Sequence, residues 1–360
     1  MKIMQIGAAF VGAQEKIESG IHKQLLNKGY DSVILYATGV SEVSGIIRYE
    51  SKLLNLLRRG LIKIFGKNDI FASFSTMKLI KLLKKYNPDV VHLHVLHHNY
   101  VNYAMLLNYL AKKNIPVLFT MHDMWAFTGG CYHYTEMNCQ NYKSECKVCP
   151  AKEQKLDCRV RSVEKNFKKK KKLFGKIKRI AFSTVSSWVY NQMDESFLNH
   201  YPRYLVRNAV SIDRLPEKKL VKDGIFKIVG VASSWNEEKG IFRFLKLAES
   251  LGNGFEIILA GNVSNEIKQI APSNITFVGM ISNKVELSKI YDSSDLHVSL
   301  SYEETFGMTF VEAALCGIKS LGFNSTAISE ILGMIDGFVV KSGDVDAVVE
   351  KIFEISKNYC

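Results

Sequence analysis

The chain has 360 residues, of which 47% are hydrophobic, and it carries 48 Lys and Arg against 35 Asp and Glu, a net charge of +13. This length exceeds the size at which one hydrophobic core keeps growing, so we expect two domains. The sequence has no run of 18 uncharged apolar residues and no secretory cleavage site after its first residues, so we expect a cytoplasmic protein without membrane spans. Seven cysteines, an odd number, indicate free thiols or metal ligands rather than a disulfide scaffold.

Strand-like and helix-like runs alternate in both halves, which predicts an α/β protein with parallel sheets and crossover helices. The expected strands of the first half cover residues 2–7, 32–37, 89–94, 116–121 and 179–184. Those of the second half cover residues 226–232, 255–261, 275–278, 296–300, 319–323 and 337–340. We therefore expect two doubly wound domains, at residues 1–208 and 223–360, joined by a charged linker at 209–222.

Two stretches of the first half, residues 52–67 and 159–179, combine lysine and arginine with apolar side chains. A basic amphipathic segment suits an anionic membrane surface, where each cation near the headgroups contributes about 1 kcal/mol. Nucleic-acid phosphates attract the same charges, and a solvated lysine-rich helix face needs no partner at all. Because both stretches fall in the first half, we favour peripheral binding to an anionic membrane and expect no nucleic-acid partner.

Between the two basic stretches lie several histidines. His122 ends an apolar strand and is followed by Asp123. His92 and His94 alternate along a strand, and His97 and His98 follow it in a loop, where packing and acceptor contact remain equally open roles.

Four cysteines fall within 19 residues of the first half, at Cys131, Cys139, Cys146 and Cys149. This grouping favours a closed tetrahedral zinc site of structural function, with Cys158 outside the set. A closed site has no open coordination position, so no catalytic metal is expected.

In the second half, Glu304 and Glu312 flank a glycine-containing turn between a predicted strand and a predicted helix. Open α/β sheets bind ligands at the carboxyl ends of their strands, and a helix amino terminus there offers unpaired N–H groups to a phosphate. Carboxylates also accept hydrogen bonds from hydroxyl groups. A nucleotide-activated sugar has both of the matching parts.

The segment from Glu304 to Glu312, with Phe306-Gly307 inside it, resembles the E-x7-E signature of retaining family 4 glycosyltransferases with the GT-B fold. Residues 231–240, 207–213 and 277–280 resemble further motifs of that family, and residues 120–129 resemble the H-D-x-W-x-F-T-G segment of members that assemble polysaccharide and O-antigen. The resemblance spans nearly the whole chain. It implies two Rossmann-like domains that face a cleft.

The resemblance also implies roles for single residues. Lys239 would stabilise the departing diphosphate, assisted by the helix starts near Gly240 and Gly307, while Glu304 would accept hydrogen bonds from the donor sugar. Glu312 would bind the nucleotide ribose, and His122 would contact the transferred sugar. Ser233 or Ser234 stands where relatives often have arginine, so one phosphate contact is expected to be neutral. The remaining donor-binding residues implied are Gly12, Ser234, Phe306, Met308 and Thr309.

The function expected from the sequence is a retaining glycosyltransferase of bacterial surface polysaccharide biosynthesis. It would move a hexose-type sugar from a UDP-sugar, or else a GDP-sugar, to a lipid-linked saccharide at the inner face of the cytoplasmic membrane. A sugar-nucleotide epimerase or a transferase with a soluble acceptor is the alternative among enzymes. A nucleic-acid-binding zinc protein is the alternative from another class, and it gives no role to Glu304, Glu312 or Lys239.

Overall fold

The computed structural model describes residues 1–10, 12–39, 41, 43–152, 156–213 and 224–357. The chain divides into two compact units, Met1–Ala209 and Val210–Cys360. Most of the expected linker, from residue 214 to 222, lies outside the described residues.

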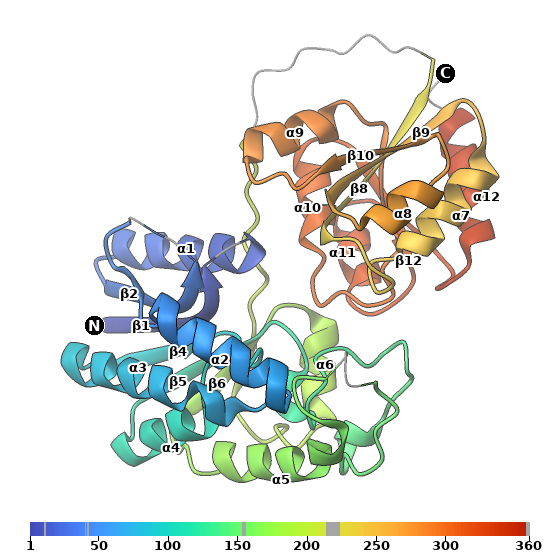
Figure 1. The fold of residues 1–360 in the computed structure, drawn as a ribbon. Coiled ribbons are helices and arrows are strands. Elements are labelled where there is room, and N and C mark those ends of the chain that lie inside the picture. The colour runs from blue at the N-terminus through green and yellow to red at the C-terminus, as the bar shows by residue number, and fades with distance from the viewer. Residues whose placement is uncertain (11, 40, 42, 153–155, 214–223, 358–360) are drawn as a thin grey trace. The chain divides into compact units, whose positions relative to one another are not determined.

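The first unit contains a seven-stranded parallel sheet in the order β3-β2-β1-β4-β5-β6-β7 (Figure 1). Its strands are β1 Lys2–Phe10, β2 Asp31–Gly39, β3 Ile46–Arg48, β4 Val90–Leu93, β5 Val117–Met121, β6 Ile180–Thr184 and β7 Arg203–Leu205. Its helices are α1 Gly12–Asn27, α2 Lys52–Phe65, α3 Ser73–Tyr86, α4 Tyr103–Lys113, α5 Val163–Phe174 and α6 Ser187–Asp194. Short 3₁₀ helices lie at η1 Asp69–Ala72, η2 Trp125–Phe127, η3 Asn141–Lys143 and η5 Val160–Ser162.

The second unit contains a six-stranded parallel sheet in the order β10-β9-β8-β11-β12-β13. Its strands are β8 Phe226–Ser234, β9 Phe255–Asn262, β10 Ile275–Gly279, β11 Leu296–Ser299, β12 Lys319–Phe323 and β13 Phe338–Val340. Its helices are α7 Ile241–Leu251, α8 Asn265–Ile270, α9 Lys284–Asp292, α10 Met308–Leu315, α11 Ile328–Met334 and α12 Val345–Lys357. The Asp344 side chain caps α12, since its Oδ1 accepts a hydrogen bond from the Ala347 N–H at 3.0 Å.

The eleven predicted strands are confirmed, with boundaries that shift by up to three residues. Two strands escaped prediction, β3 and β7, and both are three-residue strands at the edges of the first sheet. The central strands are buried on both faces, as parallel sheets covered by crossover helices require. In β1, for example, Met4 and Ile6 are completely buried.

Each sheet has a point where the chain changes the direction in which it adds strands. In the first sheet this point lies between β1 and β4, and in the second it lies between β8 and β11. Ligands of open α/β sheets bind at the carboxyl ends of strands at such a point, because the crossover connections there run to opposite faces and leave a crevice. The two candidate regions described below lie at these points.

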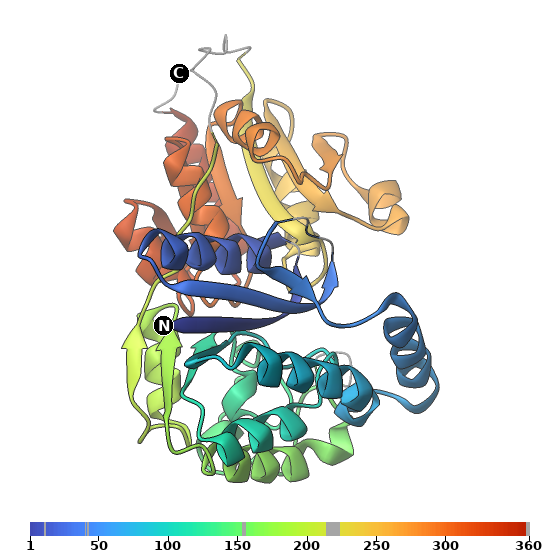
Figure 2. The ribbon, with the colours of Figure 1, turned by 90° about the vertical axis from the view of Figure 1, so that its left-hand side faces the viewer.

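Helix α2 projects from the rest of the first unit (Figure 2). Arg58 is its only buried residue. The Arg58 guanidinium donates to both carboxylate oxygens of Glu50 at 2.9 Å and to the Asn99 carbonyl at 3.2 Å. On another face of α2, exposed apolar side chains follow helical spacing at Leu53, Leu56, Leu57, Leu61 and Ile64.

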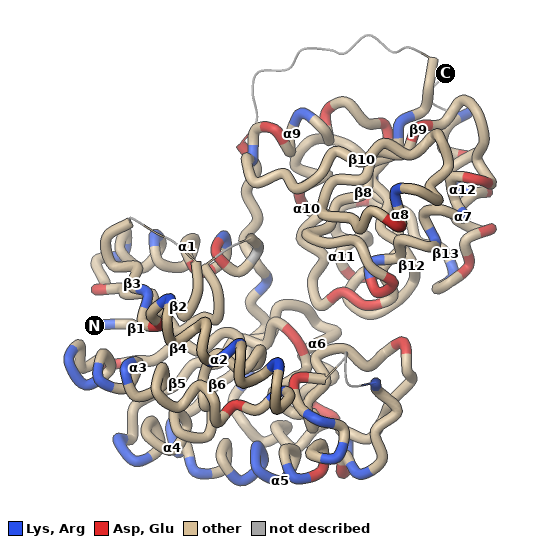
Figure 3. Tube along the Cα trace, in the orientation of Figure 1, with Lys and Arg blue, Asp and Glu red and all other residues tan. Residues whose placement is uncertain are grey.

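Lysine and arginine line α3, α4 and α5 of the first unit (Figure 3). No helix among the described residues has the length and apolar character that crossing a membrane requires.

Candidate functional site

The edge of the second sheet brings together two of the predicted site residues, Lys239 and Glu304. Lys239 follows β8 and Glu304 follows β11, which are neighbours in the sheet. The Lys239 Nζ lies 2.5 Å from Glu304 Oε1, and both side chains are partly exposed. Burial opposes the charge on Lys239, but the neighbouring Glu304 carboxylate prevails and raises the pKa of Lys239 above its usual value. The lysine is therefore fully charged at neutral pH.

Two glycines in left-handed conformations start the helices beside this ion pair. Gly240, with φ of 81°, precedes α7, and a Cβ there would lie 2.5 Å from the Leu300 carbonyl oxygen. Gly307, with φ of 78°, precedes α10 and packs against the Phe310 ring. A side chain at either position would be strained and would collide with its neighbours. Both helices therefore begin at the carboxyl edge of the sheet with their first N–H groups free of side-chain caps.

The other donor-binding residues predicted in this unit lie at the same edge, at the end of β8 and around the start of α10. Ser234 is exposed at the end of β8, and Phe306 is buried in the turn before α10. Met308 and Thr309 in the first turn of α10 are partly exposed. Glu312, one turn further on, is only 4% exposed, and Tyr291 forms a side-chain hydrogen bond with it. Glu312 is therefore buried beside Tyr291, whose hydroxyl also donates to the Thr309 carbonyl at 3.4 Å.

In the first unit, strand β1 packs at Gly7 against a buried carboxyl group, where a turn was predicted from the sequence. A Cβ on Gly7 would collide with both carboxyl oxygens of Glu18 and with the Gln14 amide. Glu18 Oε1 accepts a hydrogen bond from Gln14 Nε2 at 2.7 Å, whereas its buried Oε2 has no partner among the described residues. Burial raises the pKa of Glu18 to about 8, so this carboxyl is neutral at pH 7. Gly12, predicted in this turn, has φ of 63° and begins α1 with open space around it.

His122 stands at the end of a chain of hydrogen bonds across β1, β4 and β5. The Gln5 amide Nε2 donates to the Glu18 carbonyl at 3.2 Å, and Gln5 Oε1 lies 3.1 Å from His94 Nε2. His94 Nδ1 lies 3.0 Å from His122 Nε2. Because a carbonyl oxygen can only accept, it fixes the Gln5 amide, and Gln5 Oε1 must accept from His94.

That direction carries through the chain to His122. Burial lowers the pKa of His122 to about 4 and that of His94 still further below its usual value, so both rings are neutral at pH 7. A neutral His94 that donates from Nε2 accepts at Nδ1, so His122 donates from its Nε2. The His122 Nδ1 then carries a lone pair and can accept a hydrogen bond from a hydroxyl group.

Of the four other histidines of this region, three are buried and one is exposed to solvent. His92, like His94, is buried, and its Nε2 lies 2.7 Å from Thr120 Oγ1. His97 is buried and its Nε2 lies 2.6 Å from Asp123 Oδ2. Burial alone would raise the pKa of Asp123, but His97 and the Trp125 N–H lower it well below its usual range. His98 is the exposed member of the group.

Several residues at these two edges were not singled out from the sequence. Gln5 and Glu18 orient the first site, and Tyr291 and Thr326 do so in the second, where Thr326 Oγ1 accepts from the Glu304 N–H at 3.1 Å. Glutamine in a buried strand is the one signal that could have revealed Gln5, since a buried amide needs partners. The others occupy ordinary positions on helices and in loops.

Three of the five lysines at residues 168–172 have partners within the described part of the chain. Lys168 pairs with Glu145 and Glu164, and Lys169 pairs with Asp69 at 3.4 Å. Lys170 is buried, and its Nζ donates to the carbonyls of Trp125 at 2.6 Å and Thr128 at 3.0 Å. Burial lowers the pKa of Lys170 to about 8. Only Lys171 and Lys172 are both exposed and unpaired among the described residues of this run.

The four grouped cysteines are close enough for their charges to influence one another, and burial raises the pKa of Cys131 to about 12 and that of Cys146 to about 11. Across the described residues, no three His, Cys, Asp or Glu side chains form a group that could hold a metal ion. The four predicted ligands, Cys131, Cys139, Cys146 and Cys149, therefore do not form a tetrahedral site among the described residues. A structural zinc remains a prediction that requires this segment to close further.

Known families and structures match both units. The family described as Glycosyltransferase Family 4 matches residues 21–147, and Glycosyl transferases group 1 matches residues 214–359. The chain is 21% identical to the putative colanic acid biosynthesis glycosyl transferase WcaC of Escherichia coli (strain K12), over 97% of this chain and 90% of the relative.

Two solved structures share the fold over nearly the whole chain. Sucrose-phosphate synthase from Thermosynechococcus elongatus superposes with a TM-score of 0.69 at 14% identity, over 99% of this chain and 90% of that one. Anabaena HepE in complex with UDP-glucose superposes with a TM-score of 0.65 at 13% identity, over 100% of this chain and 90% of that one.

Proposed function

The chain belongs to the GT-B glycosyltransferases, and we propose that it transfers a sugar, with retention of configuration, from a nucleotide-sugar to a lipid-linked saccharide in bacterial surface polysaccharide biosynthesis. The observation that carries the proposal is the meeting of Lys239 and Glu304 across 65 residues of sequence at one edge of the second sheet. The relative named for colanic acid biosynthesis supports the pathway. The likeness to HepE, solved with UDP-glucose, supports a UDP-sugar as donor.

Transfer breaks the bond between the anomeric carbon and the diphosphate, which leaves negative charge on the phosphates. The Lys239 ammonium and the uncapped N–H groups at the starts of α7 and α10 lie where they can stabilise that charge. Donor entry then separates the Lys239–Glu304 pair. Glu304, relieved of the lysine, accepts hydrogen bonds from sugar hydroxyls, so one event readies both residues.

His122 and Glu312 complete the proposed set. The lone pair on His122 Nδ1 suits a hydroxyl of the transferred sugar. The Glu312 carboxylate, oriented by Tyr291, suits the ribose of the nucleotide. We assign no catalytic metal, because the cationic lysine and the two helix starts supply the positive potential that leaving phosphates need.

The lipid-linked acceptor and a place on the inner face of the cytoplasmic membrane rest on α2. Its exposed apolar row is flanked by Lys52, Arg59 and Lys63, which is the pattern of a helix that lies in an anionic membrane surface. The structure thus supports one of the two basic stretches as a membrane contact better than the other.

The experiment has two stages. Thermal unfolding of the full chain is first measured with UDP-, GDP- and ADP-sugars, and we expect a UDP-sugar to give the largest rise in melting temperature. Transfer of that sugar is then measured for Lys239→Ala, with an expected loss on the order of 10²-fold. Lys246→Ala is the control, because Lys246 forms an exposed ion pair with Asp346 at 2.9 Å in the same unit.

Other outcomes identify the alternatives. Conversion of the nucleotide-sugar to its epimer without any acceptor would identify an epimerase, and transfer only to free saccharides would exclude the lipid acceptor. Absence of a thermal shift with every nucleotide-sugar, together with salt-sensitive binding to nucleic acid, would contradict the enzyme assignment of the site.

A further inference from the structure

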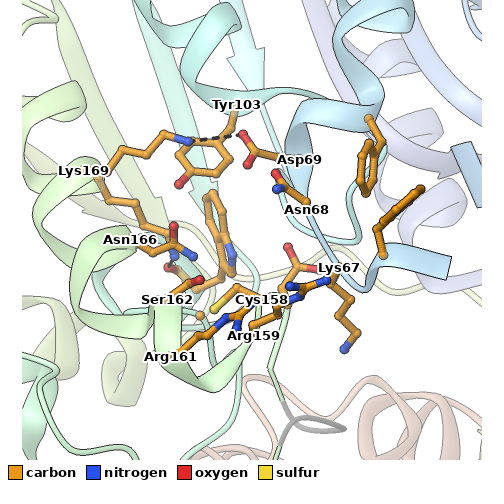
Figure 4. Close-up of a pocket in the computed structure, with 16 residues that line it drawn as sticks. Lys67, Asn68, Asp69, Tyr103, Cys158, Arg159, Arg161, Ser162, Asn166 and Lys169 are labelled. Atoms are coloured by element: carbon orange, nitrogen blue, oxygen red, sulfur yellow. Dashed lines mark hydrogen bonds and ion pairs between the residues drawn. The ribbon is translucent and has the colours of Figure 1, made fainter. Parts of the chain in front are cut away.

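A cavity of about 600 Å³ opens in the first unit, between the end of α2 and the segment that leads into α5 (Figure 4). Aromatic rings of Phe65, Phe71, Tyr103 and Trp125 form part of its lining. Five cations line it as well, against two acids. A cavity with this lining suits a ligand that is both anionic and partly apolar.

The two acids of the cavity already have partners. Asp69 pairs with Lys169, and the Asp157 carboxylate accepts hydrogen bonds from the His98 N–H and the Asn99 amide, each at 2.8 Å. Neither acid forms a hydrogen bond or an ion pair with Arg159 or Arg161, the two arginines of the lining.

Arg159 and Arg161 differ from the other cations of the cavity in having no hydrogen bond or ion pair with any described residue. Lys67 donates to the Leu156 carbonyl, and Lys170 is committed to two carbonyls. In Figure 4, Arg159, Arg161 and Lys67 lie together, at the opposite end of the cavity from the Lys169–Asp69 pair. Two guanidinium groups without protein partners at one end of a cavity can bind the oxygens of a phosphate through their paired N–H donors.

The same end of the cavity joins the apolar face of α2. Phe65, the last residue of α2, lines the cavity and is 53% exposed, which continues the apolar row that ends at Ile64. The next residue, Gly66, is in contact with Arg159, whose Nε would lie 2.9 Å from a Cβ added there. An alkyl chain along α2 would therefore place a phosphate at the end of that chain beside Arg159.

The cavity also adjoins the histidine cluster. Trp125 lines it, and the Trp125 ring lies 6.1 Å from that of His97. The Trp125 backbone N–H donates to Asp123 Oδ1 at 2.8 Å, and Asp123 directly follows His122 in the sequence. A headgroup held in the cavity would thus stand next to the candidate site of the first unit.

From these observations we propose that Arg159 and Arg161 bind the phosphate or diphosphate that joins the alkyl chain of the acceptor lipid to its saccharide, and that this alkyl chain lies along α2. This inference rests on the proposed function, because it names how that function's lipid acceptor is held. It assigns the specificity for phosphate to two arginines and leaves the attraction to any anionic bilayer to the other exposed cations.

Vesicle flotation of the full chain tests the assignment. One set of phosphatidylcholine vesicles carries phosphatidic acid, whose headgroup is an exposed phosphomonoester, and a second set carries phosphatidylserine at matched surface potential. We expect the unmodified protein to prefer phosphatidic acid by about 10-fold or more, since charged hydrogen bonds to phosphate exceed simple surface attraction. Arg159→Ala/Arg161→Ala should abolish the preference, while Lys171→Ala/Lys172→Ala, with the same charge change outside the cavity, should keep it.

A second pair of substitutions separates the paired donors from their charge. Arg159→Lys/Arg161→Lys should still bind anionic vesicles but lose the preference for phosphatidic acid, because an ammonium is a point charge without the fork. A preference that survives in either arginine double variant would overturn the proposal. Free pyrophosphate is added as a competitor in the same flotation assay. If it blocks binding to phosphatidic acid vesicles at a concentration no higher than that of the vesicle-borne phosphate, the proposal would also be overturned, since the ligand would then be a soluble anion.

The thermal shift with nucleotide-sugar is measured on the same proteins. It should be unchanged in both arginine variants, because neither arginine belongs to the donor site. A protein that shows the phosphate preference but no nucleotide-sugar shift would refute the proposed function. The reverse result would refute the role of the arginines and leave the transferase assignment intact.

Discussion

At the scale of single residues, hydrogen-bond direction fixes where the protons sit in the histidine chain of the first unit. The Glu18 carbonyl accepts from Gln5, Gln5 accepts from His94, and His94 accepts from His122. Such a chain presents one nitrogen of His122 as a permanent acceptor, so no proton has to be rearranged when a hydroxyl binds.

We expect ¹⁵N NMR of the histidine rings to show His122 protonated at Nε2 and bare at Nδ1 from pH 6 to pH 8, because its pKa is lowered to about 4. His94→Phe removes the acceptor of the His122 Nε2–H, so the two neutral tautomers should mix. Sugar transfer should fall on the order of 10-fold, the value of one hydrogen bond. A His122 tautomer that does not change in His94→Phe would contradict the chain.

Glu18 supplies a prediction about pH. Its pKa is raised from 4.5 to about 8 in the folded protein, so the folded state holds this proton more tightly than the unfolded state does. The stability that this proton contributes is fully present below pH 4.5 and is lost as the pH rises toward 8.

Glu18→Gln cannot ionise, so its free energy of unfolding should decline less than that of the unmodified protein across this pH window. The difference should grow to a few kcal/mol and level off above pH 8. Urea unfolding at pH 5 to 9 measures it. Glu249→Gln, on an exposed part of α7, is the control and should leave the pH profile unchanged. Parallel profiles for Glu18→Gln and unmodified protein would show that Glu18 is ionised in both states.

Motifs of fixed spacing single out Lys239 and Glu304 in the sequence, and the structure brings these two residues together at one sheet edge. The sequence could not predict Gln5, Glu18 or Thr326, because their roles arise only when strands and loops far apart in sequence become neighbours. The zinc site at the four cysteines stays a prediction, since no group of three metal-binding side chains is found among the described residues.

At the scale of elements, strands with apolar runs were predictable down to the three residues of β13, whereas β3 and β7 are equally short and each includes an arginine. The two basic stretches also separate here. In α5 the spacing of the lysines turns Lys170 inward and brings Lys168 and Lys169 to acids, which a charge count cannot reveal. In α2 the apolar row is exposed and only Arg58 is buried.

Helix α2 therefore carries the prediction for membrane binding. Leu56→Ser/Ile64→Ser removes two side chains that are 69% and 74% exposed, so folding should be unaffected. Burial of each side chain in lipid is worth roughly 1.5–3 kcal/mol, so flotation with anionic vesicles should fall by at least about 10-fold. Ile270→Ser, at a residue 62% exposed on α8 of the second unit, is the control. Equal loss in the control, or none in α2, would exclude α2 as the contact.

At the scale of the whole molecule, charge is divided very unequally between the two units. Residues 1–209 carry 33 Lys and Arg against 15 Asp and Glu, and residues 210–360 carry 15 against 20. The net charge of +13 therefore conceals a strongly basic first unit and a mildly acidic second one. An anionic surface attracts the first unit and repels the second.

Binding to anionic vesicles should accordingly weaken as salt rises, since screening shortens from about 10 Å at 0.1 M to about 3 Å at 1 M. We expect vesicle binding to fall by about 10-fold or more across that range. The binding that remains at 1 M salt should depend on the apolar row of α2, so Leu56→Ser/Ile64→Ser should remove it. Vesicle binding that is equal at both salt concentrations would show that charge has no part in it.

The buried Arg58–Glu50 ion pair attaches α2 to the rest of the first unit. Breaking a buried ion pair of this kind costs about 3–5 kcal/mol, so Arg58 holds α2 firmly, and Phe65 at the end of the helix adds a ring contact with Phe71. The apolar row on the other face of α2 is thereby kept turned away from the protein. A bilayer that binds this row would meet a helix that is already formed and fixed, so binding would require no ordering of the segment.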